Sequence, residues 1–224
     1  MRSLILVHGA GSGPWVFDGW AEALSGFELE PVDLHAGLNV GEAAMSNYAA
    51  VVARAADWLP RPLAICGWSM GGLIAMLAAR QARADRLVVL EPSPSGELQG
   101  FDAEIPLERG TFDPEEVYGP FPPGVRSRPD SRLARAERRR GVSLPSLPCK
   151  ALVVFGDEFA DDRGRAVARR YGAEQLAFPG LDHWALVRDG RVPPRIAAWL
   201  VADRRSITHN LRSGCLAQEG GDDE

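Results

Sequence analysis

The stretch that most constrains this chain runs from residue 63 to residue 80, where an apolar run meets a helix-forming run. Between them lies a G-x-S-x-G pattern with Ser69 at its centre. A chain that turns sharply from a strand into a helix strains the backbone of the middle residue, so the flanking residues must be small. The serine hydroxyl then stands at the tip of the turn, beside the N–H groups and partial positive charge of the helix N-terminus. The pattern predicts a nucleophilic serine rather than an ordinary turn.

Composition limits the classes of partner. The chain has 224 residues, of which 46% are hydrophobic and 25% charged, enough for one domain with a sizeable core. A net charge of −5 argues against nucleic acid as a partner, because binding phosphates requires a basic face. The one basic run, residues 132–140, is interpreted as a solvated helix face, with an anion- or membrane-contacting patch as the alternative.

The same data bear on location. No apolar run reaches about 18 residues, so we expect no membrane span. The apolar run near the N-terminus is too short for a signal peptide. Three cysteines without a C-x-x-C pair indicate free thiols in a reducing compartment and no zinc site. We therefore expect a cytoplasmic protein that binds no metal and, without a glycine-rich nucleotide fingerprint, no cofactor.

Apolar runs alternate with helical patterns along the chain. We expect strands at residues 3–7, 29–34, 63–66, 86–90, 151–155 and 174–178, and helices at 17–24, 41–59, 70–83, 163–171 and 194–202. Such alternation requires crossover connections and a parallel sheet covered on both faces. The prediction is a doubly wound α/β fold with a mostly parallel sheet of about six strands.

Two segments do not follow this alternation of strands and helices. Residues 93–148 hold nine prolines and one convincing helix, at 131–140. This interval is too long for an ordinary connection, and its apolar residues favour a small packed lid over a disordered linker. The lid is expected above the C-terminal edge of the sheet, where doubly wound folds bind ligands. Residues 204–224 are polar and are expected to form a mobile tail, which leaves residues 1–203 as a single domain.

Three sequence motifs resemble those of a known protein family. V-H-G-A-G at residues 7–11, G-W-S-M-G-G at 67–72 and P-G-L-D-H-W at 179–184 occur in one order and spacing that resembles the α/β-hydrolase superfamily. The segment from residue 7 to residue 20 is similar to the branch of plant methyl-ester esterases and hydroxynitrile lyases. The resemblance covers roughly residues 3–202. It implies a serine hydrolase with Ser69 as nucleophile, and a sheet without the antiparallel N-terminal hairpin that many members have.

A serine nucleophile needs an adjacent base, and the chain offers four histidines. His209 lies in the tail, and His35 is expected in a loop after the second strand. His8 opens the glycine-rich loop and is expected to support it by hydrogen bonding. His183 follows the last strand, on the same sheet edge as Ser69. By elimination and by motif position, His183 is the predicted base.

An oxyanion hole requires two backbone N–H groups that converge near the serine. One is expected from Met70, the residue after the nucleophile, and the other from Ala10 in the loop after the first strand. Glycines on both sides of Ala10 allow that loop to approach closely, although they also suit an ordinary flexible turn.

The acidic member of the triad is the hardest to assign. The resemblance implies an aspartate about three residues past a glycine after the fifth strand, but that position holds Phe159. A loop two residues shorter would bring Asp157 into register, and Asp157 is the predicted acid. Glu158 and Asp161 are alternatives, and Glu91, just past the fourth strand, is another. Asp157 and its neighbours could also be a solvated acidic helix N-terminus.

Tryptophans near the catalytic motifs indicate the character of the substrate pocket. Trp15, Trp68 and Trp184 flank the catalytic motifs and predict a largely apolar substrate pocket, whereas Trp58 and Trp199 are expected in the core.

The prediction for function is a serine hydrolase, resembling a carboxylesterase, that cleaves a small carboxylic ester through an acyl-enzyme on Ser69. One alternative is a hydroxynitrile lyase with the same triad. Such a lyase usually needs an extra polar group over the serine, for which a lysine is one choice, but the only lysine, at position 150, precedes a strand and is expected on the wrong side of the sheet. The other is a non-catalytic ligand-binding protein of the same fold. Turnover of a short p-nitrophenyl ester would separate these classes.

Overall fold

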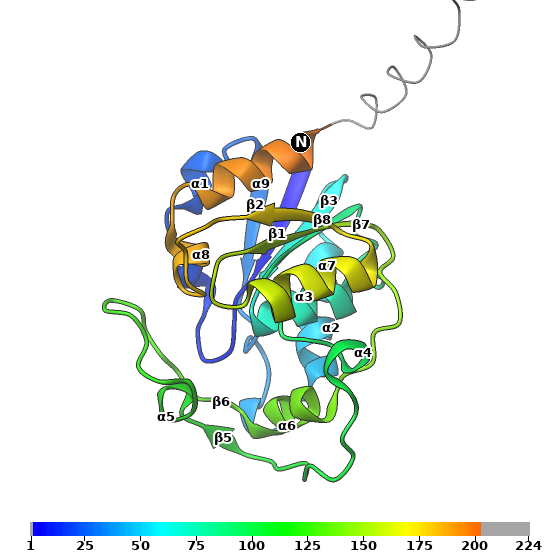
Figure 1. Ribbon diagram of the computed structural model, residues 1–224, viewed down its shortest axis with the longest axis vertical. Helices are drawn as coiled ribbons and strands as arrows, with labels where there is room; N and C mark the ends of the chain where they lie inside the picture. The colour runs from blue at the N-terminus through cyan, green and yellow to red at the C-terminus, as the bar shows by residue number, and fades with distance from the viewer. Residues whose placement is uncertain (1, 203–224) are drawn as a thin grey trace, which may run out of the picture.

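The computed structural model describes residues 2–202, so the predicted tail at 204–224 lies outside the described residues. The main sheet has six parallel strands in the order β2-β1-β3-β4-β7-β8 (Figure 1). They are β1 (Arg2–Val7), β2 (Phe27–Val32), β3 (Leu63–Trp68), β4 (Arg86–Leu90), β7 (Lys150–Phe155) and β8 (Glu174–Ala177). The predicted doubly wound sheet is confirmed; β4 has the predicted bounds, and the bounds of the other five strands differ by at most two residues.

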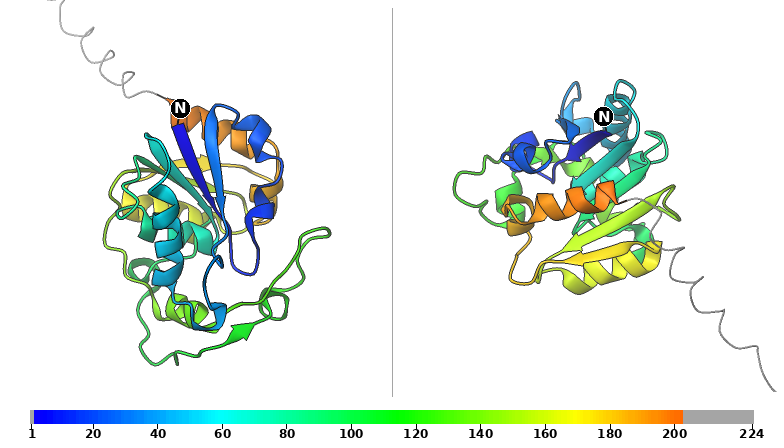
Figure 2. Two further views of the ribbon diagram at one scale, coloured as in Figure 1. Left: turned by 180° about the vertical axis from the view of Figure 1, so that it is seen from behind. Right: turned by 90° about the horizontal axis from the view of Figure 1, so that it is seen from above.

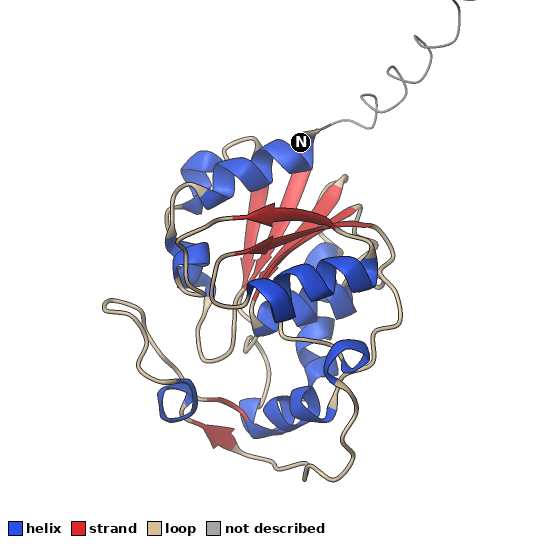
Figure 3. Cartoon of the chain, in the orientation of Figure 1, coloured by secondary structure: helices blue, strands red, loops and turns tan. Residues whose placement is uncertain are grey.

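Helices cover both faces of the sheet (Figure 3). One face carries α2 (Met45–Ala56), α3 (Met70–Ala78) and α7 (Ala166–Tyr171), and the other carries α1 (Trp20–Ala23), α8 (Ala185–Arg188) and α9 (Val192–Val201). Side chains along β3 alternate between the two cores: Ile65 packs on the α2–α3 side, and Cys66 packs on the α1–α9 side. A strand buried on both faces must be apolar throughout, as β3 is.

Two helix predictions fail for local reasons. The single helix expected at 17–24 is split into a 3-10 turn, η1 (Pro14–Phe17), and α1, because Gly19 between them has a φ of +88°. The helix expected at 41–59 is preceded by a separate 3-10 turn, η2 (Val40–Glu42), and α2 ends at Ala56. The prediction that Trp58 lies in the core is therefore wrong: it follows the end of α2 and is 89% exposed.

The chain between β4 and β7 makes a long excursion that we call the insertion (residues 93–148). It contains α4 (Gly96–Gln99), β5 (Thr111–Phe112), α5 (Pro114–Tyr118), β6 (Asp130–Ser131) and α6 (Arg132–Arg140). The insertion arches past the C-terminal ends of the strands, at the opposite end of the molecule from the N-terminus (Figure 2). Within the insertion Phe112 is buried but Phe101 is 63% exposed, so its apolar residues pack only in part.

Within residues 2–202, no helix is long and apolar enough to cross a membrane.

Candidate active site

Ser69 sits on a strained turn between β3 and α3. Its φ of 58° and ψ of −123° are uncommon for a residue with a side chain. The turn is held by a hydrogen bond from the Ser69 N–H to the Leu90 carbonyl, at 3.0 Å. A β-carbon on Gly67 would lie 2.2 Å from the Gly71 oxygen, and one on Gly71 would lie 2.3 Å from the His8 oxygen. The predicted need for small neighbours is thus a direct steric requirement.

Two N–H groups beside Ser69 have no acceptor. Met70 is the first residue of α3, where a helix leaves the backbone N–H without an intrahelical partner. Ala10 lies in the loop after β1 and lines the same pocket as Ser69. No described residue accepts a hydrogen bond from either N–H group. Both groups are therefore available to a negatively charged oxygen bound at the serine.

His183 is fixed by a buried carboxylate. Its Nδ1 lies 2.7 Å from Oε2 of Glu91, whose side chain is fully buried. The other Glu91 oxygen accepts a hydrogen bond from the Gly156 N–H at 2.9 Å. The His183 carbonyl accepts a bond from the Trp68 indole N–H at 3.0 Å. The imidazole is thus held through Nδ1, which leaves Nε2 as the nitrogen available in the pocket that Ser69 lines.

The expected contact between Asp157 and His183 is absent. Asp157 instead accepts a hydrogen bond from the Gly180 N–H at 2.7 Å, and its own N–H donates to the Leu181 carbonyl at 2.8 Å. These bonds brace the loop that carries His183. Glu91, the alternative, makes the contact with His183 that the sequence predicts for Asp157, so the geometry favours Glu91 over Asp157 as the acid.

The sheet register explains why Glu91, and not Asp157, contacts His183. Trp68 of β3 pairs with Leu90 of β4, so Ser69 and Glu91 are the next residues along two adjacent strands. The Glu91 N–H in turn donates to the Val154 carbonyl of β7 at 3.0 Å. Asp157 follows β7, which is one strand farther from Ser69 in the sheet. The position of Glu91 in the sheet is therefore closer to Ser69 than that of any carboxylate residue that follows β7.

The other acidic candidates have different roles. Glu158 accepts a hydrogen bond from the backbone N–H of His183 at 2.9 Å, and exposed Asp161 pairs with Arg165 at 2.7 Å. Phe159, at the position where the resemblance implies an acid, packs edge-on against the His183 ring at 5.2 Å between centroids. An apolar ring there shields the imidazole and leaves its orientation to Glu91.

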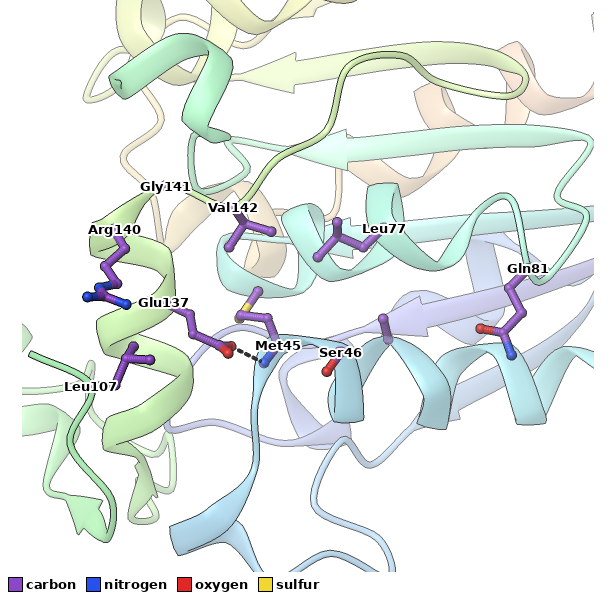
Figure 4. Close-up of a pocket in the computed structure, with 10 residues that line it drawn as sticks. Met45, Ser46, Leu77, Gln81, Leu107, Glu137, Arg140, Gly141 and Val142 are labelled. Atoms are coloured by element: carbon purple, nitrogen blue, oxygen red, sulfur yellow. Dashed lines mark hydrogen bonds between the residues drawn. The ribbon is translucent and has the colours of Figure 1, made fainter. Parts of the chain in front are cut away.

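Ser69, His183 and Ala10 line one pocket of about 330 Å³. Trp68 and Trp184 also line it, as predicted, and their rings lie 4.6 Å apart between centroids. Trp15 does not line this pocket: its indole N–H donates to the Arg126 carbonyl at 3.2 Å. A larger hollow of about 520 Å³ lies between α2, α3 and α6, where Glu137 accepts a hydrogen bond from the Met45 N–H (Figure 4). It contains none of the candidate catalytic residues.

Two buried polar clusters hold the loop that carries Ala10. In the first, His8 is fully buried, its Nδ1–H donates to the Gly9 carbonyl at 2.8 Å, and its Nε2 accepts from the Leu34 N–H at 3.1 Å. His8 thus supports this loop by hydrogen bonding, as expected. Arg128 of the insertion donates to Asp33 and to the Ser12 carbonyl, which ties the insertion to the same loop.

The second cluster centres on Asp130, at the start of β6. Its carboxylate accepts hydrogen bonds from the Gly11 N–H at 2.8 Å and the Tyr48 hydroxyl at 2.7 Å, and lies 3.4 Å from His35. Burial alone would raise the pKa of Asp130, but the adjacent His35 ring and the hydrogen bond from Tyr48 outweigh it and hold that pKa well below its usual range. The carboxylate is therefore ionised, and it anchors the insertion beside Ala10.

We expect stability to fall as the pH drops through the range in which an exposed histidine gains a proton. Burial lowers the pKa of His8 in the folded protein, and the Asp33 carboxylate, 3.8 Å from Nε2, opposes that effect only in part. The unfolded chain, with a histidine pKa near about 6.5, then binds more protons than the folded chain. The contribution of neutral His8 is fully present above that value and is lost as the pH falls toward the folded pKa.

Urea midpoints at about pH 7.5 and about pH 5.5, on either side of the unfolded value, would test this. The wild-type midpoint should fall more on acidification than that of His8→Asn, which has no titrating ring. Equal falls in the two proteins would contradict the assignment of a neutral, buried His8.

Residues 2–91 match the family model described as Thioesterase domain. A pimeloyl-[acyl-carrier protein] methyl ester esterase from Nitrosomonas europaea is 35% identical over 94 residues, which are 41% of this chain and 37% of that protein. The chain spans less than half the length of the curated relatives that it matches.

Solved structures match over most of the chain. Polyneuridine aldehyde esterase superposes with a TM-score of 0.61 at 16% identity and covers 90% of this chain and 100% of its own. This chain has the α/β-hydrolase fold. An extracellular α/β-hydrolase from a Paenibacillus species gives a TM-score of 0.60 at 15% identity, over 90% of this chain and 98% of its own. At such identities the likeness concerns the fold, and the chemistry must be argued from the site.

Proposed function

We propose that this α/β-hydrolase-fold protein is a serine hydrolase that cleaves a small carboxylic ester through an acyl-enzyme on Ser69. One observation carries the proposal: fully buried Glu91 holds His183 by a hydrogen bond, and His183 lines the same pocket as the strained Ser69. A nucleophile, a base and a group that orients the base are the three parts that acyl transfer requires.

In the proposed reaction, the Ser69 hydroxyl oxygen attacks the ester carbonyl while Nε2 of His183 takes the hydroxyl proton. The N–H groups of Ala10 and Met70 stabilise the oxyanion that forms. Glu91 stabilises the imidazolium, which then gives its proton to the leaving alcohol. A water molecule, deprotonated by His183, attacks the acyl-enzyme and releases the carboxylic acid and free Ser69.

The insertion is proposed as a lid over this reaction. Tyr118 and Phe121, which belong to the insertion, line the pocket with Ser69, and Phe121 packs against Trp184 at 4.7 Å between centroids. The proposed partner is a small-molecule ester, and the aromatic lining suits an apolar acyl or alcohol group. Cys66 and Cys149 are free thiols, which supports a reducing compartment such as the cytoplasm.

Hydrolysis of p-nitrophenyl butyrate by the purified chain tests this proposal. We expect turnover above the buffer rate with release of butyrate, because the pocket has room for a short acyl chain. A folded chain that releases no p-nitrophenol from acetate, butyrate or hexanoate esters would contradict it, and would favour a ligand-binding role for the same pocket.

A thioester is the second candidate substrate, since residues 2–91 match a thioesterase model. The same triad would attack a thioester carbonyl, with a thiolate as leaving group. Comparing kcat/KM for an S-butyryl thioester with that for p-nitrophenyl butyrate would rank the two classes.

A further inference from the structure

Two arginines line the same pocket as Ser69 and His183. Arg138 comes from α6 of the insertion, and Arg163 comes from η3 (Ala160–Arg165), a π-helical turn after β7. Both are only partly exposed. The basic run at 132–140 is thus more than the solvated face that its composition indicates, because Arg138 turns toward the pocket whereas Arg139 remains exposed.

Neither guanidinium forms an ion pair with a carboxylate among residues 2–202. The Arg163 guanidinium lies over the Phe159 ring, 3.9 Å from its centroid, and forms no hydrogen bond or ion pair with another described side chain. Arg138 donates to neutral oxygens, the Ser93 hydroxyl at 3.4 Å and the Tyr118 hydroxyl at 3.1 Å. Its Nε is buried with no partner among the described residues.

The neighbouring carboxylates, Glu91 and Glu158, already have other hydrogen-bond partners. Burial lowers the pKa of Arg163, and the neighbouring Arg138 cation lowers it further, against the attraction of Glu91 and Glu158. Glu91 is already hydrogen-bonded to His183 and Gly156, and the Glu158 carboxylate accepts from the His183 N–H. Placing two unpaired cations in a partly buried pocket costs free energy that an anionic ligand would offset.

We infer that Arg138 and Arg163 bind a carboxylate carried by the ester substrate. This inference rests on the proposed function, because it names the substrate class of the same pocket. Guanidinium groups present planar, paired N–H donors that match the two oxygens of a carboxylate. One arginine comes from the insertion and the other from η3. A pocket of about 330 Å³ accepts a small ester with one such group.

Two matched ester pairs test the inference. In the first, mono-p-nitrophenyl glutarate is compared with its neutral methyl ester, which places the charge on the acyl side. In the second, para-acetoxybenzoate is compared with its methyl ester, which places the charge on the alcohol side. We expect kcat/KM to favour the anionic member of at least one pair by about tenfold or more, as a charge-assisted hydrogen bond allows. No preference in either pair would overturn the inference.

The variants Arg138→Met and Arg163→Met locate the effect. Each should lower the ratio of anionic to neutral kcat/KM by about tenfold, toward one, because methionine fills similar space without charge. Arg139→Met removes the same charge from an exposed position of α6 and should leave the ratio unchanged. An unchanged ratio in both pocket variants, or an equal loss in Arg139→Met, would overturn the inference.

A binding measurement separates this inference from the proposed function. Sodium glutarate should raise the thermal unfolding midpoint of the wild type more than that of either pocket variant, whether or not any ester is cleaved. Inactivity toward every ester together with this glutarate effect would reject the hydrolase and keep the anion site. Turnover of the neutral esters with equal glutarate effects in all variants would reject the anion site alone.

Discussion

Replacement of Ser69 by alanine is expected to lower kcat for p-nitrophenyl butyrate by about 10⁶-fold, the scale seen when a triad nucleophile is removed. The alanine variant lacks the only group proposed to bond to the acyl carbon. Its Cβ meets the same backbone strain at a φ of 58°, so its unfolding midpoint should stay close to that of the wild type. Initial rates and urea midpoints of the purified proteins check both expectations.

Ser25→Ala provides the matched control, because Ser25 is exposed and distant from the pocket lining. That variant should keep the wild-type rate. A Ser69→Ala variant that folds and retains more than a few per cent of the activity would contradict the proposed nucleophile.

Replacement of Glu91 by glutamine is the second large expected effect, about 10⁴-fold in kcat. The glutamine carbonyl oxygen should take over the hydrogen bond from the Gly156 N–H. The amide NH₂ then faces Nδ1 of His183, which must accept rather than donate. The ring is thereby forced to carry its proton on Nε2, where it can no longer accept the Ser69 proton, and the imidazolium loses its counter-charge.

Asp157→Asn is the comparison for this variant. Its side-chain carbonyl can still accept from the Gly180 N–H, so we expect a change in kcat of only a few-fold. If Asp157→Asn gave the large loss and Glu91→Gln the small one, the observed Glu91–His183 pair would not be the working arrangement.

The elements that sequence could predict are those set by local pattern. The six strands are short apolar runs between turn signals, and the turn at Ser69 follows from glycine spacing alone. Ala10 and His183 could be named because they follow strands that end at the same sheet edge. Each of these predictions depends on residue type and on spacing along the chain.

The features that sequence missed depend on spatial order. Glu91 and Asp157 both follow strands, and only the strand order, with β4 beside β3, decides which of them lies closer to Ser69. The helical pattern that suggested a buried Trp58 runs past the actual end of α2. Arg138 could not be separated from its basic neighbours, because which side of α6 faces the pocket depends on how the insertion folds back over the sheet.

The central claim, that Ser69 is an activated nucleophile, is tested most directly by a fluorophosphonate probe and peptide mass spectrometry. We expect one covalent adduct on the peptide that contains Ser69, slower labelling in Glu91→Gln, and no adduct in Ser69→Ala. Labelling of Ser69→Ala at the wild-type rate, or an adduct on a different residue of the wild type, would contradict it.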